Sequence, residues 1–278
     1  MRGCSCRGTA GFVHVSCLAE QAKILVAEAE ENNLGDDAVD SRAERWYSCS
    51  LCEQDYHGAV FCALGWACWK TYLGRPETDE FRGIAMTRLG NGLSAADHDE
   101  DALTVREVEL AMKRRLGASV YNILISQSNL SNSYHNVGRI EEALQMRRDV
   151  YSGWMRLAGE HRNTIHAASN YAISLLDLQR HAEVKSLMRT TIPVAQRVLG
   201  ESNATLKLKA IYAGALMKAS DATLNDVREA VTTFEETARI SRRVLGSAHP
   251  AAVDFEAKYR KSRELLRACE AAMAPSNA

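Results

Sequence analysis

Three pairs of cysteine or histidine residues, each with one or two residues between its members, could bind metal near the start of the chain: Cys4 and Cys6, His14 and Cys17, and Cys49 and Cys52. A zinc ion takes four such ligands in a tetrahedron, and the short spacing lets both side chains of a pair reach one ion. Six ligands therefore supply one complete zinc site and half of a second. We expect Zn²⁺ as the cofactor of this segment.

The compartment in which the cysteines lie decides between metal binding and disulfides. The chain starts MRGCSCRG, without an apolar signal segment, so we expect an intracellular protein, with the cytoplasm favoured over the nucleus. Clustered cysteines in a reducing compartment are more often metal ligands than disulfides. The longest apolar run, residues 59–69, is too short to span a bilayer. A net charge of −1 gives no sign of a nucleic-acid partner.

Helices must hold these ligands in place. Residues 18–31 have apolar side chains along one face and predict an amphipathic helix. The polar stretch 32–41 predicts a loop, and residues 59–72 predict a short buried helix. Cys62 and Cys68 lie within that apolar helix, so we interpret them as small buried hydrophobic residues and not as ligands.

The ligand spacing, C-x-C-x7-H-x2-C-x31-C-x2-C, resembles the last six ligands of a RING-CH (RING-variant) finger more than those of a PHD finger. Trp46, three residues before Cys49, fits the same family. The resemblance implies a cross-braced finger in which alternate ligand pairs share an ion. Cys4 and Cys6 would then bind one zinc with Cys49 and Cys52. His14 and Cys17 would form half of a second site, whose other pair would precede Met1. The chain departs from the family in its long 31-residue gap and in having Ser50-Leu51 where many such knuckles carry proline.

Fingers of this type recruit a ubiquitin-conjugating enzyme and position its thioester, so they supply no catalytic nucleophile. In that interpretation Trp46 would belong to the surface that docks the conjugating enzyme. The chain itself offers no phosphate-binding loop and no serine nucleophile elbow. The acidic run 97–101 is best interpreted as a helix start, where carboxylates meet the positive end of the helix dipole.

The rest of the chain repeats. Leu116, Leu157, Leu199 and Leu245 mark helix ends and are separated by 41, 42 and 46 residues. A fixed period of this size indicates a solenoid of helical hairpins. Four hairpins are predicted, followed by a capping helix at 250–272: 78–95 with 98–115, 119–136 with 139–157, 162–178 with 181–198, and 203–219 with 222–244.

The sequence therefore predicts a mainly α protein, an α-solenoid of TPR-like helical hairpins with a small zinc-finger-like region at its N-terminus. Its expected parts are residues 1–75, a partial finger with the following helix; residues 76–249, four repeats; and residues 250–278, a capping helix and tail.

The repeats carry recurring motifs: Asn129-Leu-Ser, Asn170-Tyr-Ala, the turn that begins at Gly138, and Arg-Val-Leu-Gly near 243–246. These resemble kinesin-light-chain-type tetratricopeptide repeats. The resemblance implies that the first helix of each hairpin lines a concave groove, which holds a peptide from a partner protein.

One position of the first helices recurs at the period: Arg88, Asn129, Asn170 and Ile211. Because an asparagine amide both donates and accepts hydrogen bonds, Asn129 and Asn170 could clamp a peptide backbone. The alternative is that they bond a neighbouring helix. Arg88 and Asn132, with His135 and Lys209, would add polarity to the groove.

Two functions remain open. The first, which we prefer, is a non-catalytic scaffold that binds partner peptides through its repeats. The second is a RING-CH-type ubiquitin ligase whose repeats recruit the substrate. The partners would be a protein or peptide in the groove and, in the second case, also a ubiquitin-conjugating enzyme.

Overall fold

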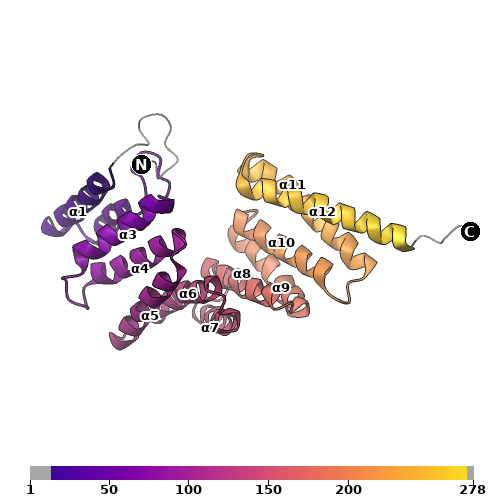
Figure 1. Cartoon of the computed structure of the whole chain (residues 1–278), viewed down its shortest axis with the longest axis horizontal. Coiled ribbons are helices and arrows are strands. Elements are labelled where there is room, and N and C mark those ends of the chain that lie inside the picture. Colours follow the sequence, from indigo (N-terminus) through magenta and orange to yellow (C-terminus); the bar gives the residue numbers. More distant parts are fainter. Residues whose placement is uncertain (1–13, 274–278) are drawn as a thin grey trace, which may run out of the picture. The chain divides into compact units, whose positions relative to one another are not determined.

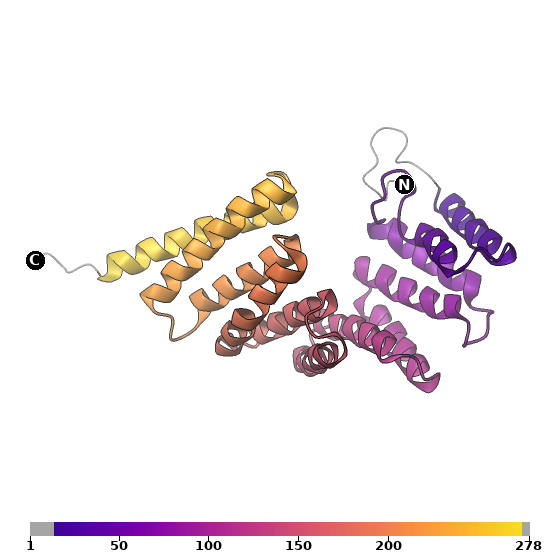
Figure 2. The ribbon, with the colours of Figure 1, turned by 180° about the vertical axis from the view of Figure 1, so that it is seen from behind.

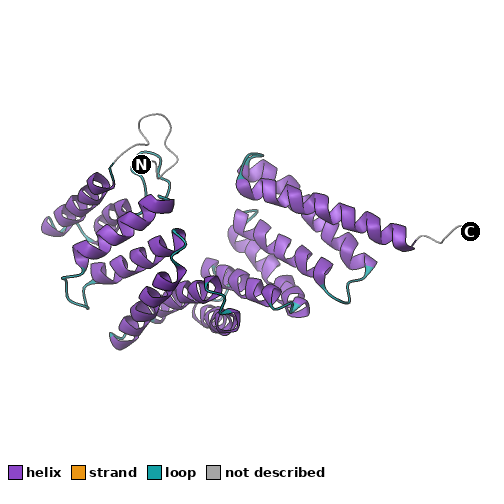
Figure 3. Ribbon diagram, in the orientation of Figure 1, coloured by secondary structure: helices purple, strands orange, loops and turns teal. Residues whose placement is uncertain are grey.

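A computed structural model describes residues 14–273, and these residues are almost entirely helical (Figure 3). Among them there is no strand, only an isolated antiparallel bridge between Ser48 and Asp55. The helices are α1 (Val15–Glu31), α2 (Asp36–Ala43), η2 (Glu44–Trp46), α3 (Gly58–Tyr72), α4 (Glu80–Ala95), α5 (Asp99–Arg115), α6 (Val120–Asn136), α7 (Ile140–Ala158), α8 (Arg162–Asp177), α9 (His181–Leu199), α10 (Asn203–Lys218), α11 (Leu224–Leu245) and α12 (Pro250–Met273).

The periodicity located the repeat helices correctly, and each observed boundary lies within two residues of the predicted one. The prediction of a loop at 32–41 is wrong, because α2 begins within it. Val39 and Ala43 explain this short helix, since both pack against the buried Trp46. Packing of these two apolar side chains outweighed the poor helix propensity of the aspartates.

The chain divides into two compact units, residues 1–139 and 140–278, which we describe separately. Within each unit, helices that follow one another along the chain pack side by side (Figures 1 and 2). The domain boundary that the sequence predicted at residue 75 falls inside the first unit, between α3 and α4. Those two helices share an extensive contact, so the N-terminal segment is joined directly to the first repeat.

Two glycines bring α3 and α4 into backbone contact. A Cβ atom on Gly65 would lie 2.8 Å from the carbonyl oxygen of Arg88, and one on Gly92 would lie 2.9 Å from the Cα of Cys62. Both neighbours are backbone atoms that cannot rotate away. Any side chain at Gly65 or Gly92 would therefore force the two helices apart.

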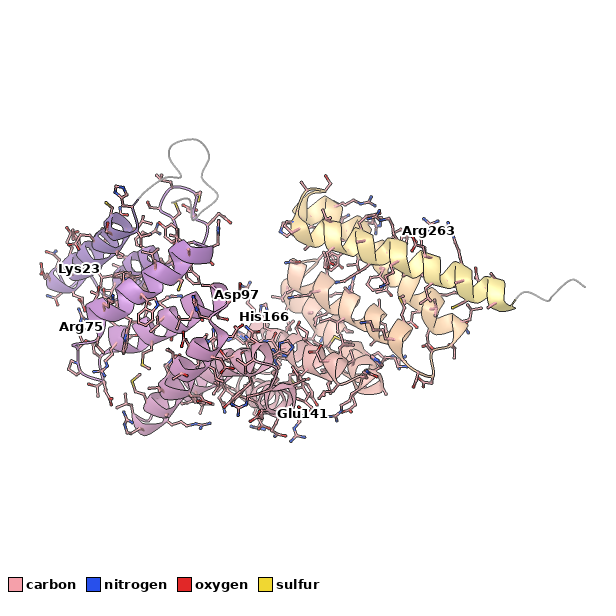
Figure 4. The ribbon with its side chains drawn as sticks, viewed as in Figure 1. Lys23, Arg75, Asp97, Glu141, His166 and Arg263 are labelled. Atoms are coloured by element: carbon pink, nitrogen blue, oxygen red, sulfur yellow. The ribbon has the colours of Figure 1, made fainter. Side chains whose placement is uncertain are left out.

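Aromatic residues fill the core beneath the N-terminal segment. Trp46 meets Tyr72 edge-on with ring centroids 5.9 Å apart, and Tyr72 stacks on Phe81 at 5.2 Å. Arg75 lies over the Tyr72 ring, and its guanidinium holds both carboxylate oxygens of Glu30 at 2.7 Å. This bidentate pair between Arg75 (labelled in Figure 4) and Glu30 holds the end of α1 against the loop before α4.

A buried polar network joins α4, α5 and α6. Arg106 donates to the Ser133 hydroxyl at 2.6 Å and to the carbonyl of Asn129 at 3.0 Å. Glu109, 1% exposed, pairs with Lys113 at 2.6 Å and accepts from Thr87. The buried charges of Arg106 and Glu109 are thus compensated by hydrogen bonds.

The second unit stacks its helices around one large apolar core that includes Leu175, Met188, Leu206 and Phe234. Arg147 of α7 reaches across to the Ser174 hydroxyl of α8 at 2.8 Å. Helix α10 also contacts α8 on one side and the capping helix α12 on the other. These three helices therefore form one side of the stack.

Turn geometry repeats with the sequence. The residue that links the two helices of a hairpin has a positive φ at Asp97 (60°), Gly138 (81°) and Gln179 (56°), with 41 residues between successive positions. Only glycine adopts this backbone region without cost. The same turn is therefore built three times, although a glycine stands at only one of the three positions.

Replacing Gly92 by alanine is expected to lower the free energy of unfolding by about 1–3 kcal/mol, because the new methyl group meets the backbone of α3. Gly83, on the same helix, faces open space, so Gly83→Ala should be neutral or stabilising by up to about 1 kcal/mol. Urea denaturation followed by circular dichroism measures both. Equal effects of the two substitutions would contradict the proposed contact.

Candidate functional site

The cysteine pair at 49 and 52 forms a tight turn. The Cys49 amide donates to the carbonyl of Gln54 at 2.9 Å, and the Glu53 amide donates back to the Cys49 carbonyl at 2.9 Å. The Leu51 amide lies 3.5 Å from the Cys49 sulfur and donates to it. An amide that points at a thiolate orients it as a metal ligand. Glu53 adopts a positive φ of 53° to close the turn.

The other ligand pairs are described only in part. His14 and Cys17 stand exposed at the start of α1, with Nδ1 and Sγ 4.0 Å apart. Cys4 and Cys6 lie outside the described residues. Within residues 14–273, no group of three or more metal-ligating side chains comes together. The apolar cluster around Leu18 and Tyr56 does contact both Cys49 and Cys52, so the turn lies against α1.

Trp46 is a core residue. Its side chain is 1% exposed and packs within the aromatic cluster of the first unit. In this arrangement the indole offers no docking surface to a conjugating enzyme. A large apolar side chain that does face solvent in this segment is Leu51, 71% exposed at the tip of the cysteine turn.

The residues of the first unit that we predicted to bind a peptide differ in the contacts they already make within the protein. The Arg88 guanidinium lies over the Tyr47 ring, 3.8 Å from its centroid, and burial lowers its pKa. The backbone carbonyl of Asn129 accepts from Arg106. Asn132 is half-buried on α6. Arg88 therefore lies against the N-terminal segment, while the peptide-binding roles of Asn129 and Asn132 stay predictions.

The second unit contains an apolar pocket of about 640 Å³ on the side formed by α8, α10 and α12. Phe234 of α11 and Phe255 of α12 contribute aromatic rings to its lining. Further apolar walls come from Ile173, Leu176, Ala210, Ile211, Gly214, Met217 and Ala251. The volume and apolar lining are those of a site that takes one or two large side chains.

Small residues create this space. Ala210 and Gly214 of α10 and Ala251 of α12 all line the pocket. A Cβ atom on Gly214 would meet nothing within 4 Å. The opening therefore depends on side chains that are too short to fill the gap between the two helices.

The lining of the apolar pocket also carries positive charge. Four lysines contribute to the lining: Lys207, Lys218, Lys258 and Lys261. The one acidic residue of the lining, Asp254, pairs with Lys258 at 2.6 Å. Three lysines therefore keep their charge without an acidic partner in the described structure, which favours an anionic ligand.

A second, polar pocket of about 300 Å³ adjoins the first and shares Asn203 and Lys207 with it. Its remaining lining comes from Ile165, His166, Ser169, Asn170, Ala204 and Leu208. Asn170, a residue predicted from the sequence to contact a peptide, is thus placed in a pocket beside α10.

The histidines report a positive field along these helices. Burial, together with the charges of Arg162 and Lys207, lowers the pKa of His166. Burial and the charges of Lys218 and Lys185 likewise lower the pKa of His181. Lys207 therefore acts on His166 in the polar pocket, and Lys218 acts on His181 at the start of α9. His166 is labelled on α8 in Figure 4.

Sequence reasoning missed most of this site. Lys207 follows His166 by one period of 41 residues, so the repeat itself could have indicated that the two residues face one another. Lys209, which we expected in the groove, is 6% exposed and lies 3.4 Å from both Glu201 and Glu236. Two positions along a helix reverse the direction of a side chain, which explains this error.

The acidic run 97–101 lies where a helix start was expected. Asp99, Glu100 and Asp101 form the first turn of α5, and Asp99 also accepts a hydrogen bond from Asn136. None of the described helices is long and apolar enough to cross a membrane.

The model of the tetratricopeptide repeat family matches residues 222–251. The crystal structure of kinesin-light-chain TPR-like repeats from Podosopora anserina is similar, with 15% identity, 84% of this chain and 98% of that chain covered, and a TM-score of 0.53. The crystal structure of BtubC (BKLC) from P. vanneervenii is also similar, with 14% identity, 96% of this chain and 95% of that chain covered, and a TM-score of 0.53. The repeats have the tetratricopeptide fold.

A Rap protein complexed with Competence and Sporulation Factor is also similar, with 12% identity, 90% of this chain and 65% of that chain covered, and a TM-score of 0.50. No curated protein matches the chain significantly in sequence. At these identities the tetratricopeptide likeness establishes the fold, and the ligand has to be inferred from the pockets.

Replacing Lys207 by alanine is expected to raise the pKa of His166 toward its ordinary value, because one of the two neighbouring positive charges is lost. Lys185→Ala should leave His166 unchanged and raise the pKa of His181 instead. Histidine-selective NMR titration measures both. A constant pKa for His166 in Lys207→Ala would show that Lys207 does not act on the polar pocket.

Proposed function

We propose that this chain is a non-catalytic scaffold that binds a peptide segment of a partner protein on the α8, α10 and α12 side of its second unit. The apolar pocket with its lysine border carries this proposal. The Rap structure, a protein of similar fold, is complexed with a factor. That complex supports ligand binding by such repeats in general and does not identify the ligand of this chain.

Different residues of the two pockets would bind different parts of the peptide. One large apolar side chain of the peptide would enter between Gly214 and Phe255, where its burial contributes roughly 2–3 kcal/mol. The Asn170 amide would bond the peptide backbone. Lys218 and Lys261 would attract acidic residues that flank the apolar anchor, and this contribution would weaken with salt.

Filling the pocket tests the proposal without disturbing the fold. Gly214→Leu should abolish binding of peptides selected from a display library with the full chain, because the new side chain occupies the opening. Thermal stability should stay equal or increase, since leucine favours a helix more than glycine by roughly 1 kcal/mol.

Gly83→Leu is the matched control, because Gly83 also lies in a helix, also faces open space and belongs to the first unit. This variant should bind the selected peptides as well as the unaltered chain. Full binding by Gly214→Leu at normal stability would place the peptide elsewhere.

As a second candidate we propose a zinc finger held by Cys49 and Cys52 together with Cys4 and Cys6, with His14 and Cys17 as half of another site. The amide of Leu51 directed at the Cys49 sulfur supports Cys49 as a ligand. Bound zinc would supply structural cross-links, not catalytic chemistry. Such a finger would make ubiquitin-ligase activity the alternative function, with the exposed Leu51 offered to a conjugating enzyme.

Zinc content measured by native mass spectrometry is expected to be one ion per chain and to fall to zero in Cys49→Ser. Cys62→Ser should keep the ion, because Cys62 lies in α3 and contacts an apolar cluster. A metal-free native chain would defeat the finger. An autoubiquitination assay across a panel of conjugating enzymes then decides the ligase function, and silence with zinc bound would exclude it for that panel.

A further inference from the structure

The polar pocket between α8 and α10 differs in chemistry from the apolar pocket beside it. Its polar lining consists of His166, Ser169, Asn170, Asn203 and Lys207, without a carboxylate. Every one of these side chains can donate a hydrogen bond. The nearest acidic residue in the sequence, Glu201, lies 3.4 Å from Lys209 instead. The pocket therefore favours a ligand rich in acceptors and negative charge.

Ser169 gives independent support for a ligand. The residue is only 9% exposed and lines this pocket. In the described part of the chain its hydroxyl has no hydrogen-bond partner. Lys207 likewise makes no ion pair there. A hydroxyl that lines a pocket without a protein partner is free to bond a ligand there.

The start of α10 adds to the positive field. Asn203 and Ala204 are the first two residues of this 16-residue helix, and both line the pocket. The first amides of a helix lack acceptors within it and carry the positive end of the dipole. The Ser202 side chain caps only the amide of Thr205. The amides of the first turn therefore add to the positive potential at the pocket edge.

A tetrahedral dianion suits this pocket better than a single carboxylate. Phosphate oxygens accept more hydrogen bonds and carry about twice the charge near neutral pH. The neighbouring positive charges of Arg162 and Lys207 already disfavour protonation of His166. A bound dianion would reverse that effect and stabilise the imidazolium.

We propose that the polar pocket formed by His166, Ser169, Asn170, Asn203 and Lys207 is a subsite for a phosphorylated side chain of the bound peptide. This inference rests on the proposed peptide-binding function. The shared lining of Asn203 and Lys207 makes the phosphate subsite continuous with the apolar pocket. One peptide could therefore occupy both, and its phosphorylation state would control binding.

The first experiment uses O-phosphoserine and inorganic phosphate as probes of the full chain. Histidine-selective NMR should show a saturable shift of the His166 resonance and a raised pKa with either probe. Lys207→Ala should weaken this binding about tenfold or more, because a charge-assisted hydrogen bond is lost. Lys185→Ala should not, since Lys185 lines neither pocket. Equal binding by Lys207→Ala and the unaltered chain would overturn the subsite.

The second experiment compares degenerate peptide arrays that carry phosphoserine, serine or glutamate at one fixed position. A preference of about tenfold or more for phosphoserine over both alternatives supports the proposal. Equal binding of glutamate, or binding of inorganic phosphate without any peptide preference, overturns it. Peptide binding without phosphate preference would refute the subsite and leave the scaffold function standing. Binding of O-phosphoserine without any peptide binding would refute the scaffold function instead.

Discussion

A buried arginine that bonds a serine on the following helix recurs at the repeat period. Arg106 bonds Ser133 in the first unit, and Arg147 bonds Ser174 in the second, 41 residues further along at both ends of the bond. Burial lowers the pKa of Arg147 to about 10, so its charge is held at a cost in solvation. Such a group is tolerated only with partners in place. The arginine–serine bond therefore fixes the distance between the helix that carries the arginine and the helix that follows it.

The next repeat replaces this bond by apolar packing. One period after Arg147 and Ser174 stand Met188 and Ala215, and both are fully buried. Apolar contact has no preferred direction, so it constrains the angle between hairpins less than a hydrogen bond does. The sequence period also lengthens, from 41 and 42 to 46 residues, at this point. The apolar pocket beside Gly214 opens in the same part of the second unit, one period after the last arginine–serine bond.

Patterns within short segments of the sequence were enough to predict the repeat helices, because a stripe of apolar residues at helical spacing is a property of the segment itself. They failed at α2, where the partly buried Val39 packs against a cluster built around a tryptophan that follows it in the chain. They failed again for the pockets, because an opening depends on which short side chains face one another across α10 and α12. The cysteine spacing predicted a turn at Cys49, which the Leu51 amide forms. The family resemblance implied a docking role for Trp46, whereas its side chain packs in the core.

The order of the two pockets along α10 limits what a ligand can be. The polar lining is centred near Asn203 and Lys207 at the start of the helix, and the apolar lining near Gly214 and Met217 at its end. About eight to ten residues of helix separate the centres, which corresponds to roughly 12–15 Å. An extended peptide covers that distance in about four residues. A peptide that fills both pockets must therefore carry its anionic group and its large apolar side chain about four residues apart.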